Sequence, residues 1–338
     1  MRLMKTLLTV ITALAAIPSS AAELSVRKLG LSVPGGVLVR SADHVLVVAG
    51  NGATFEVQGD GKVSEIPRDE RQPSPDLLPF PVVKDGRIAS GSFGRVVAWY
   101  ADETESYGHG ALGDSVEALT LVVQEEGEKS ARYTVTGDEV FEDLEPRIVD
   151  LDREQPGRPE VVTITASATD GAGIAVFGLG RDGDGNPSLI RLANSARIGA
   201  PYRWLNIAGI DDFDGDGFTE IAYVDRPHIR GELVFLEWRG GRLREQARVG
   251  GYANHHGGST IQDLSEVADV DGDGTPDLIL PVRGYDAIAV VALTAEGPKR
   301  IAVVSIPSAP RSNILSISPN SAVYLDGDGT LFEIRWAP

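Results

Sequence analysis

The chain has 338 residues, with 31 Lys and Arg against 49 Asp and Glu, a formal net charge of −18 and no cysteine. A negative charge of this size argues against nucleic acid or an anionic membrane as a partner, because both repel an acidic protein. The lack of cysteine excludes disulfide bonds. With 39 glycines, 20 prolines and few long amphipathic helical patterns, the sequence favours many strands and turns, and therefore an all-β fold.

The N-terminus has the pattern of a secretory signal peptide. Arg2 and Lys5 precede an apolar stretch over residues 7–17, and a Ser-Ala-Ala cleavage site follows it. The apolar stretch is too short for a membrane span of about 20 residues. We therefore expect residues 1–22 to be removed and residues 23–338 to form one exported domain, periplasmic or extracellular, without membrane insertion.

Eight short runs rich in Val and Ile come next, in two groups at residues 36–67 and 87–137. Such runs, with turn-forming residues between them, predict strands. Four strands in each group is the make-up of one blade of a β-propeller. Neither group contains an acidic loop, so we expect no metal site in this part of the chain.

Further along, an acidic loop occurs twice in nearly the same form, as DFDGDGFTE at 212–220 and DVDGDGTPD at 269–277. Carboxylates at loop positions 1, 3, 5 and 9 repel one another unless a cation neutralises them. Ca²⁺ fits best, because it takes about six to eight oxygen ligands, here the side chains and a main-chain carbonyl near position 7. The predicted ligands of the two sites are Asp212, Asp214, Asp216, Phe218 and Glu220, and Asp269, Asp271, Asp273, Thr275 and Asp277.

These loops differ from an EF-hand at loop position 12 and in their flanking segments. An EF-hand needs a Glu at position 12 and a helix on each side, whereas position 12 is Tyr223 in one loop and Leu280 in the other. The flanking segments are short runs of Ile and Val that read as strands. The pattern predicts a strand-loop-strand metal site, and the alternative is an acidic hairpin turn without metal.

A stretched version of the loop, DLDREQPGRPEVV, begins at residue 150. With two residues inserted before its glycine, its ligands would be Asp150, Asp152, Glu154 and Glu160. A third Ca²⁺ and a loop without metal are equal alternatives here. Two other Asp-Gly runs, at 182–186 and 326–329, either join predicted strands directly or lack two of the four carboxylates, so we expect plain turns.

The acidic loops are spaced regularly. Asp212 and Asp269 are 57 residues apart, and a further 57 residues lead to Asp326. A fixed period of this length is typical of propellers and solenoids. With four strands in each period we expect about six blades, with five to seven as the range. The early run SVRKLGLS would supply the fourth strand of the last blade, so that N- and C-terminal strands close the ring.

The acidic loops with their flanking strands resemble FG-GAP or VCBS repeats, which build the β-propellers of integrin-α-like proteins. The resembling segments lie at about 144–165, 206–225 and 263–282, and GSFGRVVAWY at 91–100 is similar to the Phe-Gly element of that repeat. The resemblance implies Ca²⁺ bound in the acidic loops. It also implies a role in binding, adhesion or scaffolding.

Polar and aromatic residues that break the repeat are candidates for a specific task. They are Arg203, Trp204, His228, Arg230, Asn254, His255 and His256, joined by Tyr202 and Tyr252. Aromatic and Arg side chains are enriched at recognition surfaces, so we expect a ligand-binding face here. The alternatives are surface histidines without a specific role and, for Trp204, packing between blades.

No catalytic residue is assigned, because the sequence contains no recognisable Ser or Cys nucleophile with a supporting base. The leading hypothesis is an exported, calcium-binding propeller that serves as a binding, adhesion or scaffold module for a protein or glycan ligand. The alternatives are a propeller-type carbohydrate hydrolase or lyase that uses the off-repeat His and Arg residues, and a purely structural module. The oligomeric state does not follow from the sequence.

Overall fold

The structure is a computed structural model that describes residues 22–41, 43–67, 79–90, 95–151 and 157–337. Within these ranges the chain forms strands β1 to β25 and no helix. Accordingly, the described residues include no helix able to cross a membrane. The predicted signal peptide, apart from Ala22, lies outside the described residues.

Four of the sheets have four antiparallel strands each. One contains β2 (Val37–Ser41), β3 (His44–Val48), β4 (Thr54–Val57) and β5 (Val63–Ile66). The next contains β15 (Leu205–Asp211), β16 (Thr219–Asp225), β17 (Glu232–Trp238) and β18 (Leu243–Gly250). A third contains β19 (Glu266–Ala268), β20 (Asp277–Pro281), β21 (Ala287–Thr294) and β22 (Gly297–Ser305). The last contains β1 (Glu23–Ser32), β25 (Thr330–Ala337), β24 (Ser321–Leu325) and β23 (Leu315–Ser318).

The fifth sheet has nine strands, where the sequence predicts separate four-stranded units. Its first strands are β6 (Ala89–Ser90), β7 (Val96–Thr104), β8 (Glu117–Glu125) and β9 (Ala131–Thr134). The others are β10 (Glu139–Phe141), β11 (Arg147–Val149), β12 (Glu160–Ser167), β13 (Gly171–Arg181) and β14 (Pro187–Asn194). Strand pairing joins the two groups only where β10 pairs with β8, through the single pair Phe141 and Ala118, and a shared apolar cluster packs them together.

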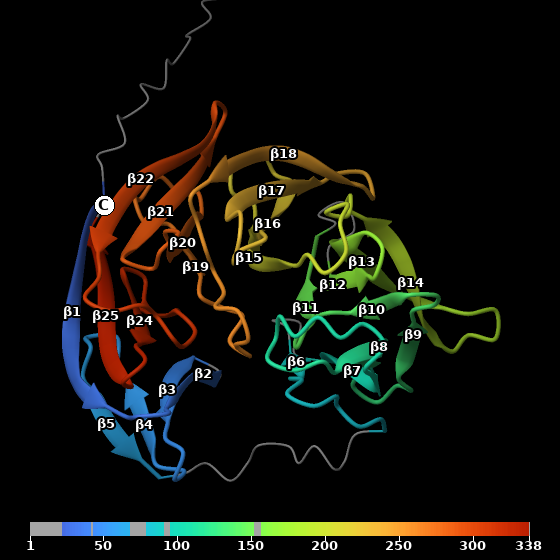
Figure 1. Ribbon diagram of the computed structural model, residues 1–338, viewed down its shortest axis with the longest axis horizontal. Coiled ribbons are helices and arrows are strands. Elements are labelled where there is room, and N and C mark those ends of the chain that lie inside the picture. Colours follow the sequence, from blue (N-terminus) through green and yellow to red (C-terminus); the bar gives the residue numbers. More distant parts are fainter. Residues whose placement is uncertain (1–21, 42, 68–78, 91–94, 152–156, 338) are drawn as a thin grey trace, which may run out of the picture.

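The sheets follow one another around a common centre, in the arrangement of a β-propeller (Figure 1). Burial explains why the strands differ in sequence. Strands β16, β20 and β24 are buried over their whole length, because neighbouring sheets cover both of their faces. The outer strands β14 and β18 alternate between exposed and less exposed residues, as expected for a strand with one face in water.

Apolar clusters join consecutive sheets. One joins β12 and β13 to β15–β17, and another joins β15–β17 to β20 and β21. Two more join β20–β22 to the sheet of β23–β25, and that sheet to β2–β5. Among the described residues, no such cluster joins β2–β5 to β6–β9. The closed ring and the count of about six blades therefore remain predictions.

The N-terminal strand lies in the C-terminal sheet, as the sequence predicts. Strand β1 pairs with β25 in antiparallel register from Glu23 opposite Ala337 to Lys28 opposite Phe332. The side chain of Arg27 forms an ion pair with that of Glu333 across this register. One sheet thus contains both the beginning and the end of the described chain.

Candidate metal sites and histidine pocket

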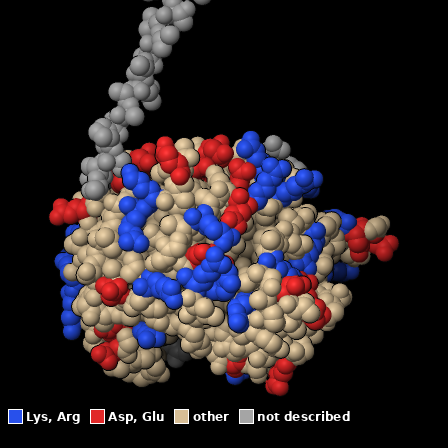
Figure 2. Space-filling model, turned by 45° about the horizontal axis from the view of Figure 1, so that its top comes forward, with Lys and Arg blue, Asp and Glu red and all other residues tan. Residues whose placement is uncertain are grey.

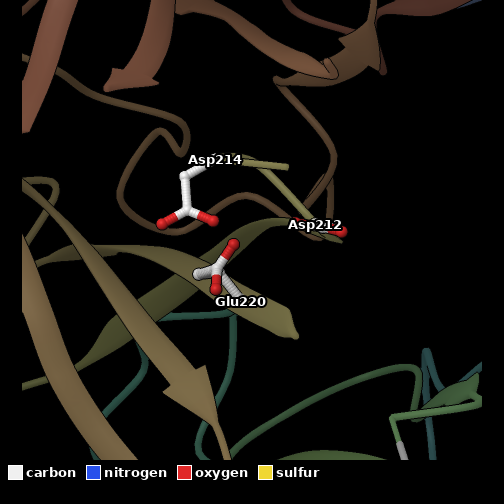
Figure 3. A group of neighbouring side chains, drawn as sticks. All are labelled: Asp212, Asp214 and Glu220. Carbon is white, nitrogen blue, oxygen red and sulfur yellow. The ribbon is translucent and has the colours of Figure 1, made fainter. Parts of the chain in front are cut away.

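The first acidic loop joins the buried strands β15 and β16, and two hydrogen bonds fix its shape. The amide of Phe213 donates to Glu220 Oε2 at 2.8 Å, and the amide of Gly217 donates to Asp212 Oδ2 at 3.0 Å. Phe213 is fully buried and holds the loop against the core. Asp214 points from the loop toward Glu220 on the strand (Figure 3). The loop is therefore built around its carboxylates.

The second acidic loop, between β19 and β20, has the same two bonds. Val270 donates its amide hydrogen to Asp277 Oδ2, and Gly274 donates to Asp269 Oδ2, both at 3.0 Å. The glycines need the left-handed region, with φ of +93° at Gly217 and +91° at Gly274. The same two amide-to-carboxylate hydrogen bonds, at the same loop positions, make the two loops structurally equivalent.

The stretched loop before β12 repeats this pattern. The amide of Leu151 donates to Glu160 Oε2 at 2.8 Å, and that of Gly157, with φ of +85°, donates to Asp150 Oδ2 at 2.7 Å. The alignment with two inserted residues thus places Gly157 correctly. The other two predicted ligands, Asp152 and Glu154, lie outside the described residues.

The donor sets suit an oxygen-ligated cation. Ligand oxygens of Asp212, Asp214 and Glu220 lie within 4.8 Å of one another, as do those of Asp269, Asp271 and Asp273. Among the described groups, Oε1 of Glu220 is buried without a hydrogen-bond partner. A buried carboxylate oxygen that has no hydrogen-bond partner and lies beside other carboxylates is suited to act as a Ca²⁺ ligand.

Burial strongly raises the pKa of the carboxylate at position 9 of each clear loop, which lies at the start of the following strand. Without a cation, desolvation and then the neighbouring Asp charges raise the pKa of Glu220 to about 8. The same causes raise the pKa of Asp277 to about 7. A bound cation would favour the charged form of both groups, because opposite charge lowers a carboxyl pKa.

One acidic neighbour is not evident from the sequence. Glu237 on β17 lies directly opposite Glu220 in the strand register, and its carboxylate belongs to a group with Asp216 and Glu220. Cross-strand register is set by the folded sheet, so the loop motif does not reveal it.

The two remaining Asp-Gly runs form turns, as expected. Asp182 Oδ1 accepts the amides of Asp184 and Asn186 at 3.0 and 2.9 Å in the hairpin between β13 and β14. Asp326 Oδ1 accepts the amides of Asp328 and Thr330 at 3.0 and 2.9 Å between β24 and β25. These carboxylates satisfy the backbone of a tight turn.

A second feature lies at the other end of the strands. The acidic loop follows the pair Asp211 and Glu220, whereas the opposite end of the same sheet begins at Leu205 opposite Asp225. At that end is a pocket of about 580 Å³. Its lining includes His228, His255, His256, Arg283 and Tyr285. The three repeat-breaking histidines therefore converge, although they come from two segments of the chain.

Hydrogen bonds set the tautomers in the pocket. His255 Nε2 is 2.8 Å from the carbonyl oxygen of Ser259 and must donate to it. His255 Nδ1 then accepts from Nε2 of His228, also at 2.8 Å. His256 Nε2 donates to the carbonyl of Pro310 at 2.8 Å. Burial, followed by the charge of His228, lowers the pKa of His255 to about 3.

Several predicted ligand-binding residues have structural contacts instead. Trp204 is 2% exposed, and its Nε1 donates to the carbonyl of Glu142 at 2.9 Å, so it packs between sheets. Asn254 is fully buried and donates to the carbonyls of Asn206 and Ile207. Tyr252 is part of the core between β15–β18 and β19–β22. These three side chains are therefore not available at the surface.

The predicted arginines lie near the pocket but do not line it. Arg230 forms an ion pair with Glu232 at 2.8 Å. Arg203 donates to the carbonyl of Tyr202, and its charge lowers the pKa of His109 after the larger effect of burial. Arg203 and Arg230 thus flank the histidines on the same end of the sheets.

Comparison with known families agrees with the loop geometry. Residues 212–280, which span the two clear loops, match the FG-GAP-like repeat. These residues form an FG-GAP-like repeat, and they lie within a β-propeller arrangement of sheets. No match was found among curated proteins.

The solved structures that resemble this chain share little sequence identity with it. BamB from Moraxella catarrhalis is 11% identical over 88% of this chain and 71% of its own, with a TM-score of 0.39. The WD40 domain of SCAP from fission yeast is 9% identical over 90% and 62%, with a TM-score of 0.41. BBS1N in complex with ARL6DN is 12% identical over 92% and 93%, with a TM-score of 0.38. The fold assignment rests on the sheets described above.

Sequence reasoning missed two residues of the propeller's pocket. Arg283 and Tyr285 come from the turn between β20 and β21. Tyr285 has a φ of +59°, which is rare for a residue other than glycine, and its hydroxyl donates to the carbonyl of His255. Neither residue departs from the repeat in an obvious way, and their role is evident only when the turns of neighbouring sheets meet.

Proposed function

We propose that this protein is an exported, calcium-stabilised propeller that serves as a binding, adhesion or scaffold module for a protein or glycan ligand, in the periplasm or outside the cell. The observation that carries the calcium part is the repeated pair of hydrogen bonds in three acidic loops, together with the buried, unpartnered Oε1 of Glu220. Extracellular modules bind Ca²⁺ at about 10⁻⁴ to 10⁻³ M, so export would fill such sites.

We further propose that the propeller has six blades. The nine-stranded sheet would divide between β8 and β10, because strand pairing links the two groups through a single residue pair. This division gives units β6–β9 and β10–β14, which with the four regular sheets makes six. The pairing of β1 with β25 supports a ring whose last blade contains strands from both ends of the chain.

The binding part of the proposal is supported by the position of the histidine pocket. The acidic loops lie at one end of the strands and the pocket at the other, so stabilisation by calcium and contact with a ligand would use different surfaces. A pocket of about 580 Å³ falls within the range of small-molecule sites, about 300–1,000 Å³.

A carbohydrate hydrolase or lyase is the second candidate, because three off-repeat histidines do converge in one pocket. General base catalysis works best with a pKa near the working pH. The pKa of His255 is lowered to about 3, so this residue would be a weak base at neutral pH. This favours binding over catalysis.

Two measurements test the proposal. Calcium titration followed by calorimetry, with the chelated protein as the reference, should give two or three binding events, and none would contradict the calcium part. A glycan array and an envelope-protein pull-down, each repeated with His228→Ala, should identify a partner that the variant binds more weakly. A protein that turns over an oligosaccharide in the same assays would instead support the enzyme.

A further inference from the structure

The histidine pocket differs from its surroundings in charge. The chain has a net charge of −18, yet the residues that line the pocket include no Asp or Glu. A carboxylate that does lie beside the lining is that of Asp286, 3.7 Å from the position a Cβ would take on Gly284. Basic side chains are also grouped on the surface of the molecule, as Figure 2 shows for one face.

The arginines at the pocket lack the partners that most arginines of this protein have. Arg226, Arg230 and Arg248 each form an ion pair with a carboxylate. Arg283 and Arg311, both exposed, have no ion pair among the described residues. Arg283 lines the pocket, and Arg311 directly follows Pro310, whose carbonyl accepts the hydrogen bond of the pocket residue His256. Two guanidinium groups are therefore free to bind an anion at one place.

The other walls of the pocket are flat rings held in fixed positions. The rings of His256 and Tyr285 are stacked with centroids 3.9 Å apart, and His228 lies over the buried Trp204. Tyr202, Arg226 and Tyr285, all at this end of the sheets, have φ of +50°, +49° and +59°. Such strained residues gather where a structure positions groups for function.

We propose that the pocket binds an acidic saccharide, a sugar that carries a carboxylate or a sulfate group. Arg283 and Arg311 would hold the anionic group through charge-assisted hydrogen bonds. The ring faces and imidazole nitrogens of the wall would contact the sugar ring and its hydroxyls. This inference rests on the proposed binding function and names the chemical class of its ligand.

The test uses the calcium-loaded protein and calorimetry with defined oligosaccharides. The probes are tetragalacturonate, its methyl ester, a sulfated oligosaccharide of similar length, free galacturonate and a Glu-rich peptide. We expect an acidic oligosaccharide to bind and the neutral ester to bind at least tenfold more weakly, with affinity falling as salt rises. Preference for the carboxylate or the sulfate probe identifies the group, and binding of free galacturonate shows whether one unit is sufficient.

A pair of matched variants locates the site. Arg283→Gln should weaken binding on the order of tenfold to a hundredfold, because a charged hydrogen bond is lost. Arg242→Gln removes the same charge from an exposed arginine in the turn at the calcium-loop end and should leave affinity unchanged. Both residues are exposed, so folding should be retained, as thermal unfolding would confirm.

The outcomes separate this inference from the function on which it rests. Equal binding of the ester, equal loss in both variants, or tighter binding of the peptide would overturn the acidic saccharide. If no saccharide binds while a protein partner is captured in the pull-down, the inference is wrong and the proposed binding function stands. If neither is found, both are wrong, and the calcium titration remains an independent result.

Discussion

Replacing Glu220 by glutamine should remove calcium stabilisation at the first loop without weakening the calcium-free protein. Ligand oxygens of Glu220, Asp212 and Asp214 lie within 4.8 Å of one another. Two unit charges at that distance repel by about 3.5 kcal/mol at an effective dielectric of about 20. In the chelated protein this repulsion acts only where Glu220 is charged, above its raised pKa of about 8. The glutamine amide has the same shape, carries no charge at any pH and can still accept the amide hydrogen of Phe213 through its oxygen. The chelated variant should therefore be as stable as the chelated wild type, or more stable.

With calcium the effect reverses, because the variant lacks one charged ligand. An ion at a hundredfold excess over its Kd stabilises the folded state by about 2.7 kcal/mol. For a chain of this size that corresponds to a rise in Tm of about 4 °C, which Glu220→Gln should lose. Thermal unfolding by circular dichroism, with calcium and with chelator, measures both states. The control Asp184→Asn removes the same charge from a plain hairpin turn and should keep the full rise.

Two results would refute this reasoning. One is a Glu220→Gln protein whose Tm rises with calcium as much as that of the wild type, which would mean that this carboxylate is not a ligand. The other is a chelated variant that melts well below the chelated wild type. In that case the carboxylate would stabilise the loop by itself, and the repulsion worked out above would be wrong.

Three further predictions concern the backbone of the loop, a buried acid and the N-terminal strand. Because Gly217 has a φ of +93°, Gly217→Ala should lower the free energy of unfolding, measured with urea in the presence of chelator, by about 1–2 kcal/mol. The control Gly50→Ala, where a Cβ meets open space and φ is not positive, should change it little. Burial, followed by the charge of Glu142, raises the pKa of Glu117 to about 9, so the folded state keeps a proton that the unfolded state releases above about pH 4.5. Stability should therefore fall as pH rises from about 4.5 to 9, and Glu117→Gln should flatten that fall in melts between pH 5 and 9; an unchanged slope would contradict this. Deleting residues 23–32 removes β1 and should lower Tm sharply, and an unchanged Tm would mean that this strand does not hold the C-terminal sheet together.

The acidic loops could be predicted because their chemistry is local. The backbone bonds that shape each loop join residues at most seven apart in the clear copies, as from Phe213 to Glu220, and at most nine apart in the stretched copy. The nine-stranded sheet could not be predicted in the same way. The pairing of its two halves depends on one register pair, Phe141 opposite Ala118, which joins two groups whose own strand patterns are already complete.

The pocket was only partly predictable, for a different reason. His228, His255 and His256 break the repeat and do meet, but His255 is itself buried, and Asn254 and Tyr252, which break the repeat as well, are buried too. A polar or aromatic residue outside a repeat can satisfy the backbone of a long connection as readily as it can meet a ligand. Which role such a residue has depends on whether its side chain points into the core or toward the pocket in the folded protein.

The pairing of β1 with β25 sets an order of events for the growing chain. Arg27 and Glu333 are partners 306 residues apart, and contacts so distant in sequence form late and slowly. A chain that leaves the ribosome or a translocation channel N-terminus first carries β1 unpaired until β25 has emerged. A chain that stops before Thr330 would keep an open strand edge, which is a template for aggregation. The eight residues of β25 are therefore required before β1 can pair.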